Sequence, residues 1–427
     1  MAIRWKSTRS ADAAMVSLSE AIGQGLASDG GLFVPERLPR LQVSDFDGLS
    51  SLPDVAGRFL KDFFSGDSLE GQLSQICSSA FDFAVPLRTF SDGPRVLELF
   101  HGPTAAFKDF GARFLAQCLV RTRSEFTVLV ATSGDTGGAV AAAFWKLKGA
   151  KVVVLFPEGR VSPRQQKQLT AWGENIRALS VRGDFDDCQR LVKAAFQEPA
   201  LRDSLQLTSA NSINAGRLLP QAAYYVHASL AYFRETGRPL SFFIPTGNLG
   251  NALSALWARE AGLPIGKITL CTNANRSLSE FYRSGTWKAF PTEATLANAM
   301  DVGNPSNLER LLTFQAKPSE LVAHGVGTER VDDDAIRAGI QAFDRRWSEA
   351  ICPHTATAYQ AWVRQGEPKD SALVSTAHPA KFESIVEPLL GYKIPVPSTL
   401  DFILTRTEKF TTIDPELGAL RTELQKN

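Results

Sequence analysis

One lysine of the chain, Lys108, stands between two phenylalanines in the stretch HGPTAAFKDF, residues 101–110. Lysine side chains are rarely buried without a partner, and burial lowers the pKa of the ammonium group. A deprotonated lysine amine is a nucleophile that attacks carbonyl carbon atoms. The alternative is a surface helix position, in which the stem of Lys108 lies along its neighbours and the charge reaches water. The other motifs of the chain decide between these two interpretations.

Two glycine-rich stretches each follow an apolar run and precede a helical pattern: TSGDTGGA at 132–139 and PTGNLGNA at 245–252. Strand-to-helix turns of this kind point backbone N–H groups at an anion. Neither stretch has the nucleotide spacing GxGxxG, and the sequence contains no GxxxxGK[ST] and no GxSxG. We expect both turns in consecutive parts of one sheet, where they favour a phosphorylated ligand other than a nucleotide. A purely structural role fits each turn alone equally well.

The residues around Lys108 predict a helix with Thr104 as its N-cap. The apolar face of this helix is expected to carry Phe107, Phe110 and Phe114. The neighbouring stripe, led by Lys108, continues with Gly111, Ala112 and Leu115. Small side chains near the lysine leave room for a flat ligand. Pyridoxal phosphate is flat, and it needs a lysine for its aldehyde and a cup for its phosphate.

A third motif is STAHPAKF, residues 375–382, in which a predicted strand ends in Ser-Thr. A hydroxyl group at this strand end is suited to contact a pyridine nitrogen. The same hydroxyl could instead cap a helix that starts at Pro379. The motif taken alone leaves both interpretations open.

The elements that must position these residues alternate regularly from residue 127 onward. Apolar runs typical of strands occupy 127–133, 151–157, 176–183, 205–211, 240–246, 267–273 and 371–376. Helical patterns follow most of them, with Ser162 and Asp184 as expected caps, one long helix over 218–233 and a last helix near the end of the chain. Near-continuous apolar strands that alternate with helices predict an α/β fold with parallel sheets covered by helices. Ligands in such sheets bind beyond the carboxyl ends of the strands.

The first part of the chain does not follow this alternation. We expect residues 1–95 to form a separate, mostly helical amino-terminal domain. Residues 96–427 then form the catalytic core, with a smaller lobe at about 120–212 inserted in the larger lobe.

The composition excludes several classes of protein. The 427 residues include 46 Lys and Arg against 45 Asp and Glu, and this balance argues against nucleic-acid or membrane-surface binding. The five cysteines and five histidines are dispersed, so neither a disulfide framework nor a metal centre is expected. The start of the chain lacks the apolar segment of a secretory signal, and no apolar run is long enough to span a membrane. We therefore expect a cytoplasmic protein.

The motifs HGPTAAFKDFG, TSGDTGGA, PTGNLGNA and STAHPAKF, in this order, resemble threonine synthase, a family of pyridoxal-phosphate enzymes with a two-lobed fold like that of tryptophan synthase β. The stretches 16–36 and NSINAGRLLPQ at 211–221 extend the resemblance over nearly the whole chain. It implies that O-phospho-L-homoserine and water become L-threonine and phosphate, by γ-elimination followed by β-addition of water, in the last step of threonine biosynthesis.

The resemblance also implies roles for individual residues. Lys108 would hold pyridoxal phosphate as a Schiff base and move protons on the substrate, and Thr376 would contact the pyridine nitrogen. Ser133 and Thr136 would bind the substrate carboxylate. The cofactor phosphate would lie in a cup formed by Gly247, Asn248, Leu249, Gly250 and Asn251.

Two positions depart from what is frequent in related enzymes. Asp135 stands where asparagine is common, although aspartate is familiar in this branch of threonine synthases. An ionised Asp135 only accepts hydrogen bonds, so it requires a proton on the 3-oxygen of the cofactor or a neighbouring donor. Leu249 stands where phenylalanine is frequent, and little is expected from this change because the cup is mostly backbone.

The substrate phosphate requires a second cationic site. We favour Arg217 with Asn211 and Asn214 in NSINAGR, and the alternative is Arg164 with Lys167 in SPRQQK. His101 is a further candidate for proton handling, although a structural role fits it as well.

Two other functions stay open at this point. The first is a threonine or serine dehydratase of the same fold, and the second is a threonine-synthase-like protein that binds a phosphorylated ligand without converting it. The resemblance favours a monomer, and nothing in the sequence itself determines the oligomeric state.

Overall fold

The computed structural model describes residues 2–10, 14–132, 134–314 and 317–426. Its larger sheet has six strands in the order β11-β10-β9-β12-β4-β3. All neighbours in it run parallel except the edge pair β3–β4. The predicted α/β class is thereby confirmed. The strands are β3 (Leu87–Thr89), β4 (Arg95–Glu98), β9 (Leu240–Pro245), β10 (Ile265–Thr272), β11 (Val326–Arg330) and β12 (Ser371–Ser375).

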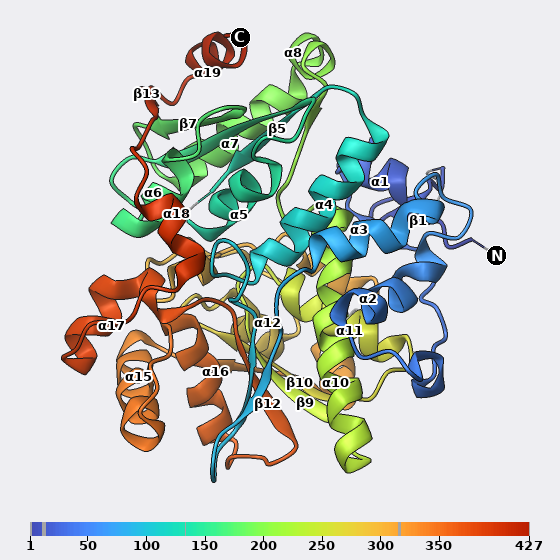
Figure 1. The fold of residues 1–427 in the computed structure, drawn as a ribbon, viewed down its shortest axis with the longest axis vertical. Helices are drawn as coiled ribbons and strands as arrows, with labels where there is room; N and C mark the ends of the chain where they lie inside the picture. Colours follow the sequence, from blue (N-terminus) through green and yellow to red (C-terminus); the bar gives the residue numbers. More distant parts are fainter. Residues whose placement is uncertain (1, 11–13, 133, 315–316, 427) are drawn as a thin grey trace.

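A second, fully parallel sheet lies above the first in Figure 1 and has the order β13-β7-β6-β5-β8. Its edge strand β13 comes from the end of the chain and was not predicted from the sequence. The strands are β5 (Phe126–Ala131), β6 (Ala150–Pro157), β7 (Ile176–Val181), β8 (Leu207–Thr208) and β13 (Thr411–Ile413).

Helices cover both faces of each sheet, which explains the near-continuous apolar strands. Phe242 packs into the core shared with α10 and α11, whereas Phe243, the next residue of β9, packs into the core shared with α15 and α16. Val128 and Leu129 of β5 divide in the same way, toward α5 and α6 on one face and toward α7 on the other. The helices are α5 (Asp135–Phe144), α6 (Pro163–Thr170), α7 (Phe185–Gln197), α8 (Pro199–Ser204), α10 (Ala222–Thr236), α11 (Gly250–Glu260), α15 (Asp333–Trp347) and α16 (Pro353–Arg364).

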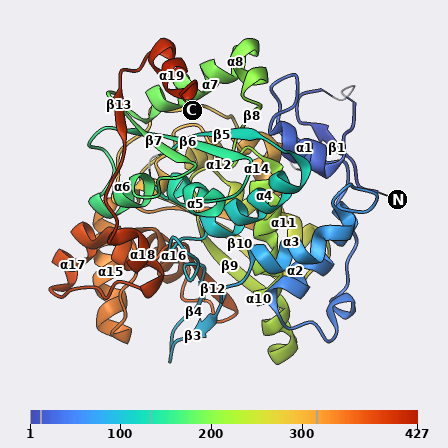
Figure 2. The ribbon, with the colours of Figure 1, turned by 45° about the horizontal axis from the view of Figure 1, so that its top comes forward.

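The amino-terminal segment is mostly helical, as predicted, and nearly all of its described buried apolar side chains belong to a core shared with α4, α10 and α11. Phe81 stacks on Phe114 of α4 at 6.0 Å between ring centroids, and Trp5 meets Trp257 of α11 at 6.0 Å. Figure 2 shows this segment against α4 and α10. The domain boundary at residue 95 and the limits of the smaller lobe stay predictions. The elements are β1 (Trp5–Ser7), α1 (Leu18–Gln24), β2 (Phe33–Pro35), α2 (Leu52–Leu60), α3 (Leu73–Ala80) and α4 (Lys108–Thr122).

Two predicted helix caps and the last predicted helix agree with the structure, whereas one long helix differs. Ser162 caps α6 and Asp184 caps α7, as predicted. The long helix expected over 218–233 is interrupted, because Pro220 has no N–H to continue the helical hydrogen bonds and a 3₁₀ turn separates α9 from α10. The last helix is present as α19. The other elements are α9 (Ala215–Leu218), α12 (Ser277–Ser284), α13 (Leu308–Leu312), α14 (Pro318–Ala323), η6 (Pro379–Phe382), α17 (Glu383–Leu390), α18 (Asp401–Leu404) and α19 (Leu417–Leu424).

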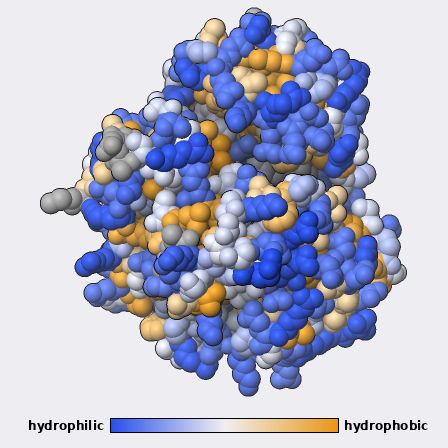
Figure 3. Space-filling view, turned by 180° about the vertical axis from the view of Figure 1, so that it is seen from behind, coloured by the Kyte–Doolittle hydropathy of each residue, from blue (hydrophilic) through white to orange (hydrophobic). Residues whose placement is uncertain are grey.

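The two glycine-rich turns belong to different sheets, so the expectation of a single sheet was wrong. TSGDTGGA follows β5 of the five-stranded sheet, and PTGNLGNA follows β9 of the six-stranded sheet. Alternation along the chain does not reveal which strands pair. The carboxyl ends of β5, β6 and β9 nevertheless border one cavity. Figure 3 shows a hollow between the upper and lower parts of the molecule.

Two features of the described residues concern membrane proteins and metalloproteins, two of the classes that the sequence argued against. None of the helices in this part of the chain has both the length and the apolar character needed to cross a membrane. The described histidine, cysteine, aspartate and glutamate side chains form no group of three or more that could hold a metal ion.

Candidate active site

A cavity of about 1830 Å³ lies at the carboxyl ends of strands from both sheets. Pockets for one small molecule are typically about 300–1000 Å³, so this cavity has room for a cofactor and a substrate together. Nearly all the predicted site residues border it. They are Lys108, Asp135, Thr136, Asn211, Arg217, Gly247, Asn248, Leu249, Gly250, Asn251 and Thr376. Ser133 lies outside the described residues.

Lys108 is the first residue of α4, and the turn before it is held by the 375–378 segment. The N–H of Phe107 donates to the carbonyl of Thr376 at 2.8 Å, and the N–H of His378 donates to the carbonyl of Ala105 at 3.0 Å. Two of the predicted motifs therefore lie side by side and fix the position of the lysine.

Thr104 does not cap this helix, contrary to the prediction. Its hydroxyl and its N–H donate to the Asp109 carboxylate at 2.7 and 2.9 Å, so Asp109 closes the turn from inside the helix. The predicted room beside Gly111 is also filled. A Cβ at Gly111 would lie 2.4 Å from the carbonyl oxygen of Arg217, because α9 packs directly on the small side chains of α4. Space for a ligand is on the cavity side of Lys108 instead.

The surroundings of Lys108 favour its neutral amine over the ammonium form more than water does for an exposed lysine. Burial lowers its pKa to about 8; Asp135 opposes this effect, and Arg217 and Lys381 add to it. An amine with a pKa of about 8 is unprotonated in about a tenth of the molecules at pH 7 and in about half of them at pH 8, and this fraction can act as a nucleophile and as a base.

The turn from Gly247 to Asn251 leads from β9 into α11. Leu249 has the left-handed backbone angle φ of 64°, which is uncommon for a residue with a side chain. The Asn248 side chain holds the turn, since its Nδ2 donates to the Ser212 hydroxyl at 2.6 Å and its Oδ1 accepts from the Ser306 N–H at 2.5 Å. Leu249 is buried in the core. A ligand phosphate therefore faces mainly the backbone of this turn.

Asn251 contributes a side-chain donor to the same place. Its Oδ1 accepts hydrogen bonds from two tyrosine hydroxyls, and its Nδ2 is buried without a partner. Buried polar groups are normally hydrogen-bonded, so an unpaired amide that borders a cavity indicates a missing acceptor. A phosphate oxygen is an acceptor of the required kind.

Asp135 opens α5 at the edge of the cavity. Burial alone raises the pKa of its carboxyl, but the positive charges of Lys381 and Lys108 lower it well below its usual value. The Nζ of Lys381 lies 2.8 Å from its Oδ1. The neighbouring donor that an ionised aspartate requires is therefore Lys381, a residue that the sequence analysis missed. The motif STAHPAKF places Lys381 near the end of a strand, but nothing in the motif indicates that Asp135 is its partner.

Thr376 borders the cavity just beyond the end of β12. The interpretation of a Ser-Thr hydroxyl as a helix cap was wrong. The Nδ1 of His378 accepts from the N–H of Ala380 at 3.1 Å and caps the 3₁₀ turn η6. The predicted contact of Thr376 with a pyridine nitrogen stays a prediction.

His354 also borders the cavity and was missed. It is the second residue of α16, and burial lowers its pKa to about 4, so the ring is neutral near pH 7. Its Nε2 accepts from the N–H of Ala299 at 3.2 Å and thereby holds the 298–300 turn. The backbone of Met300 in this turn packs against Gly247. A lone histidine in the sequence has no spacing that could have indicated this contact.

The residues predicted to bind the substrate phosphate fall into two groups. Arg217 and Asn211 border the cavity, and each has a buried polar atom without a partner, Nε of Arg217 and Oδ1 of Asn211. Asn214 does not belong with them. Its Nδ2 donates to the carbonyls of Ile22 and Ser209, and its Oδ1 accepts from the Gly216 N–H, because it caps α9.

The alternative candidates lie outside the described lining of the cavity. Arg164 donates to the carbonyl of Ala380 and pairs with Glu383 at 3.5 Å. Lys167 lies on the same helix, α6, and is likewise not among the lining residues. His101 bonds Glu98 at 2.7 Å between Nε2 and Oε2. Of the two candidate motifs, NSINAGR therefore contributes residues to the described lining of the cavity, and the basic residues of SPRQQK do not.

Arg310 is a further buried cation that the sequence analysis did not single out. Its guanidinium donates to the carbonyls of Phe33, Ser212 and Ile213, and burial lowers its pKa to about 9. These contacts hold the NSIN turn, residues 211–214, beside the turn from Gly247 to Asn251. No local signal distinguishes Arg310 from the many surface arginines of the chain.

The donor set of the cavity fits pyridoxal phosphate. A lysine of lowered pKa suits an aldehyde, a backbone turn with the unpaired Nδ2 of Asn251 suits a phosphate, and the hydroxyl side chain of Thr376 suits a ring nitrogen. Known proteins agree with this assignment. The family described as "Pyridoxal-phosphate dependent enzyme" matches residues 96–379. Fold and site therefore define a pyridoxal-phosphate-dependent enzyme.

Two further family descriptions are more specific. "Threonine synthase N terminus" matches residues 4–81, and "Threonine synthase, C-terminal" matches residues 355–423. The threonine synthase of Serratia marcescens is 42% identical over 414 residues, which are 95% of each chain. That of Escherichia coli is 40% identical over 391 residues, which are 90% of this chain and 91% of the relative. The protein belongs to the threonine synthase family.

Solved structures agree in fold over the full length. A pyridoxal-phosphate-bound threonine synthase from Brucella melitensis superposes with a TM-score of 0.92 at 33% identity and covers 99% of both chains. The Escherichia coli enzyme gives a TM-score of 0.91 at 36% identity, with the same coverage.

Proposed function

We propose that this protein is a threonine synthase, a lyase that converts O-phospho-L-homoserine and water into L-threonine and phosphate. One observation carries the assignment of a phosphorylated substrate. Two separate sets of residues that border the cavity each contain a buried donor atom without a partner: Nδ2 of Asn251 in the 247–251 turn, and Nε of Arg217 in the motif that also holds Asn211. One set serves the phosphate of the cofactor, and the other serves the phosphate that leaves the substrate.

Pyridoxal phosphate, when bound, supplies an aldehyde for Lys108 and a ring that withdraws electrons from the carbon next to the substrate amine. Lys108 would hold the cofactor through its aldehyde. The Lys108 amine, when not bound to the cofactor, would accept the α-proton of the substrate and return protons to the same carbon chain, and a pKa of about 8 suits both directions of transfer.

Other side chains bind and orient. The guanidinium of Arg217 donates to the substrate phosphate until it departs, because a planar fork matches phosphate oxygens. Thr136, at the start of α5, and Ser133 bind the substrate carboxylate. The hydroxyl of Thr376 would hydrogen-bond the ring nitrogen of the cofactor, where a hydroxyl tolerates a neutral ring. The hydrophobic cores around the cavity hold these groups in place.

The test is a product assay on purified protein with pyridoxal phosphate and O-phospho-L-homoserine. We expect phosphate and threonine in equal amounts. Release of a 2-oxo acid and ammonia from threonine would indicate a dehydratase instead, and binding without phosphate release would indicate a non-catalytic protein. Lys108→Ala should abolish phosphate release and keep the fold. Lys393→Ala, which removes a lysine that is 92% exposed, should retain the full rate and serves as the matched control.

Two expectations concern the state of the protein in the cell. We propose a cytoplasmic enzyme, consistent with a biosynthetic family. We also propose a monomer, and light scattering of the purified full chain measures its mass directly.

A further inference from the structure

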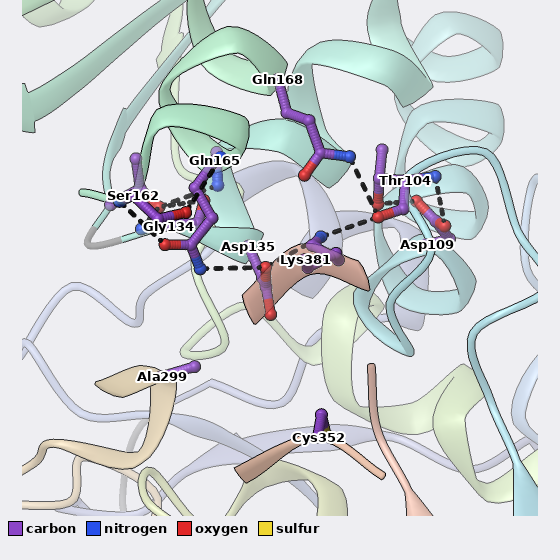
Figure 4. Close-up of polar contacts among 12 residues, drawn as sticks. Thr104, Asp109, Gly134, Asp135, Ser162, Gln165, Gln168, Ala299, Cys352 and Lys381 are labelled. Carbon is purple, nitrogen blue, oxygen red and sulfur yellow. Dashed lines mark hydrogen bonds and ion pairs between the residues drawn. The ribbon is translucent and has the colours of Figure 1, made fainter. Parts of the chain in front are cut away.

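Lys381 is a buried cation for which the proposed reaction has no use. Its side chain is 1% exposed. Its Nζ donates to Oδ1 of Asp135 at 2.8 Å and to the carbonyl oxygen of Thr104 at 2.7 Å. Figure 4 shows the ammonium between these two acceptors. Because Lys381 lies in η6, Asp135 opens α5 and Thr104 lies in the turn before Lys108, one ammonium group joins three segments of the site.

Two glutamines of α6 complete the arrangement. Gln168 donates to the same carbonyl of Thr104 at 3.1 Å, and Gln165 donates to Oδ1 of Asp135 at 3.4 Å. Both amides are neutral, so they add hydrogen bonds but no charge. Over the part of the chain that the structure describes, Lys381 is the one ion-pair partner of Asp135 within 4.0 Å. The negative charge of Asp135 is therefore balanced by Lys381.

Lys108 is the second lysine near Asp135, and it would compete for the same carboxylate. The charged and titratable groups that face Lys108 come from four elements: Asp135 of α5, Arg217 of α9, His354 of α16 and Lys381 of η6. On its own helix, Asp109 is occupied by Thr104. If Asp135 paired with Lys108, the ion pair would hold Lys108 as an ammonium, which attacks no aldehyde and accepts no proton.

We propose that Lys381 is a positioning residue that occupies Asp135 and so leaves Lys108 without a counter-ion, available as a free amine. The inference rests on the proposed role of Lys108 as the cofactor-holding lysine. The aspartate at position 135 therefore comes with its own buried cation. The pKa shifts agree in sign, since Lys381 lowers the pKa of Lys108 and Asp135 raises it.

The test measures the titration of Lys108 directly. The full-length chain, stripped of its cofactor, is labelled with isotopically light and heavy acetic anhydride between pH 6 and 11 (about the range in which lysines titrate), and the Lys108 peptide is quantified by mass spectrometry. In the wild type we expect a midpoint near the value of about 8. Lys381→Met should raise this midpoint by about one unit or more, because Asp135 then pairs with Lys108. The double variant Asp135→Asn with Lys381→Met should return it toward the wild-type value.

Two further proteins keep the result interpretable. Lys381→Gln removes the charge but keeps an N–H donor for Asp135, so it replaces the methionine variant if that variant does not fold, and the same upward shift is expected. Lys393→Met removes an exposed lysine that pairs with Glu387, and it should leave the Lys108 midpoint unchanged. An unchanged midpoint in the Lys381 variants, with or without a lower melting temperature, would overturn the proposal. Because labelling requires no turnover, this failure is distinct from failure of the proposed reaction.

Discussion

The hydroxyl of Tyr224 lies 2.5 Å from Oδ1 of Asn251, in a contact that joins α10 to the start of α11. The hydroxyl of Tyr225 lies 2.8 Å from the same oxygen. Two donors on one oxygen fix the orientation of the amide, so that its nitrogen carries the donors left for a ligand. The tyrosines thereby determine that the nitrogen of Asn251, and not its oxygen, is the atom left without a partner.

Asn251→Ala should weaken pyridoxal-phosphate binding about ten- to a hundredfold, since a hydrogen bond to a charged group contributes roughly 1.5–3 kcal/mol. Fluorescence titration of the cofactor-free protein measures this loss. Tyr224→Phe is the matched control: Tyr225 still orients the amide, so the affinity should change only severalfold. Unaltered binding by the alanine variant would remove Asn251 from the cofactor site.

Gly247→Ala should disturb the phosphate turn by a steric route. The added Cβ would lie 2.7 Å from the Cα and 2.9 Å from the carbonyl oxygen of Met300, and backbone atoms cannot rotate away as a side chain can. Overpacking of this kind costs roughly 1–3 kcal/mol, so we expect a lower melting temperature and a cofactor affinity reduced about tenfold. Gly418→Ala, where a Cβ meets open space within α19, should leave both measurements nearly unchanged.

Arg217→Ala should raise the KM for O-phospho-L-homoserine about ten- to a hundredfold and weaken inhibition by free phosphate. The visible spectrum of the bound cofactor should stay normal, because the cofactor phosphate lies at the other set of donors. Arg164→Ala is the comparison, since that arginine pairs with Glu383 outside the described lining. A strong effect of Arg164→Ala with a normal Arg217→Ala enzyme would move the substrate phosphate site to α6.

The buried histidine His354 predicts a loss of stability in mild acid. Its pKa is about 4 in the folded protein and 6.5 without burial, so the unfolded chain binds the proton more tightly. The contribution of His354 to the free energy of unfolding should therefore fall as the pH drops from about 6.5 to 4, by about 3 kcal/mol at most. Urea denaturation at a series of pH values measures the slope.

His354→Gln should reduce this slope, because its side-chain oxygen can still accept from the Ala299 N–H but does not titrate. Two other groups contribute to the pH dependence that remains. His378, whose pKa burial lowers to about 4, acts in the same direction, and Asp301, whose pKa burial raises to about 7, acts in the opposite direction. An identical pH profile for wild type and His354→Gln would show that His354 is not buried as a neutral ring.

Features carried by contiguous residues could be predicted from the sequence. The alternation of apolar runs and helices indicated parallel sheets, because burial on both faces of a strand requires apolar residues at nearly every position. The caps Ser162 and Asp184 and the turn before α11 depend on neighbours within a few residues. Lys108 and the four motifs could be recognised for the same reason, because the residues of each motif are contiguous in the sequence.

Only the tertiary structure decided which distant side chains become partners. Lys381 meets Asp135, His354 meets Ala299 and Arg310 meets Ser212 because segments that are far apart in the sequence pack against one another in and around the site. Strand pairing determines which segments come together. The apolar pattern of one strand does not indicate which other strand will pair with it. Asn214 shows the converse: its sequence placed it with the phosphate ligands, whereas the packing of α9 uses all its polar atoms as a cap. The sequence indicated Lys108 as the candidate reactive lysine, and the tertiary structure determines which charged groups surround it.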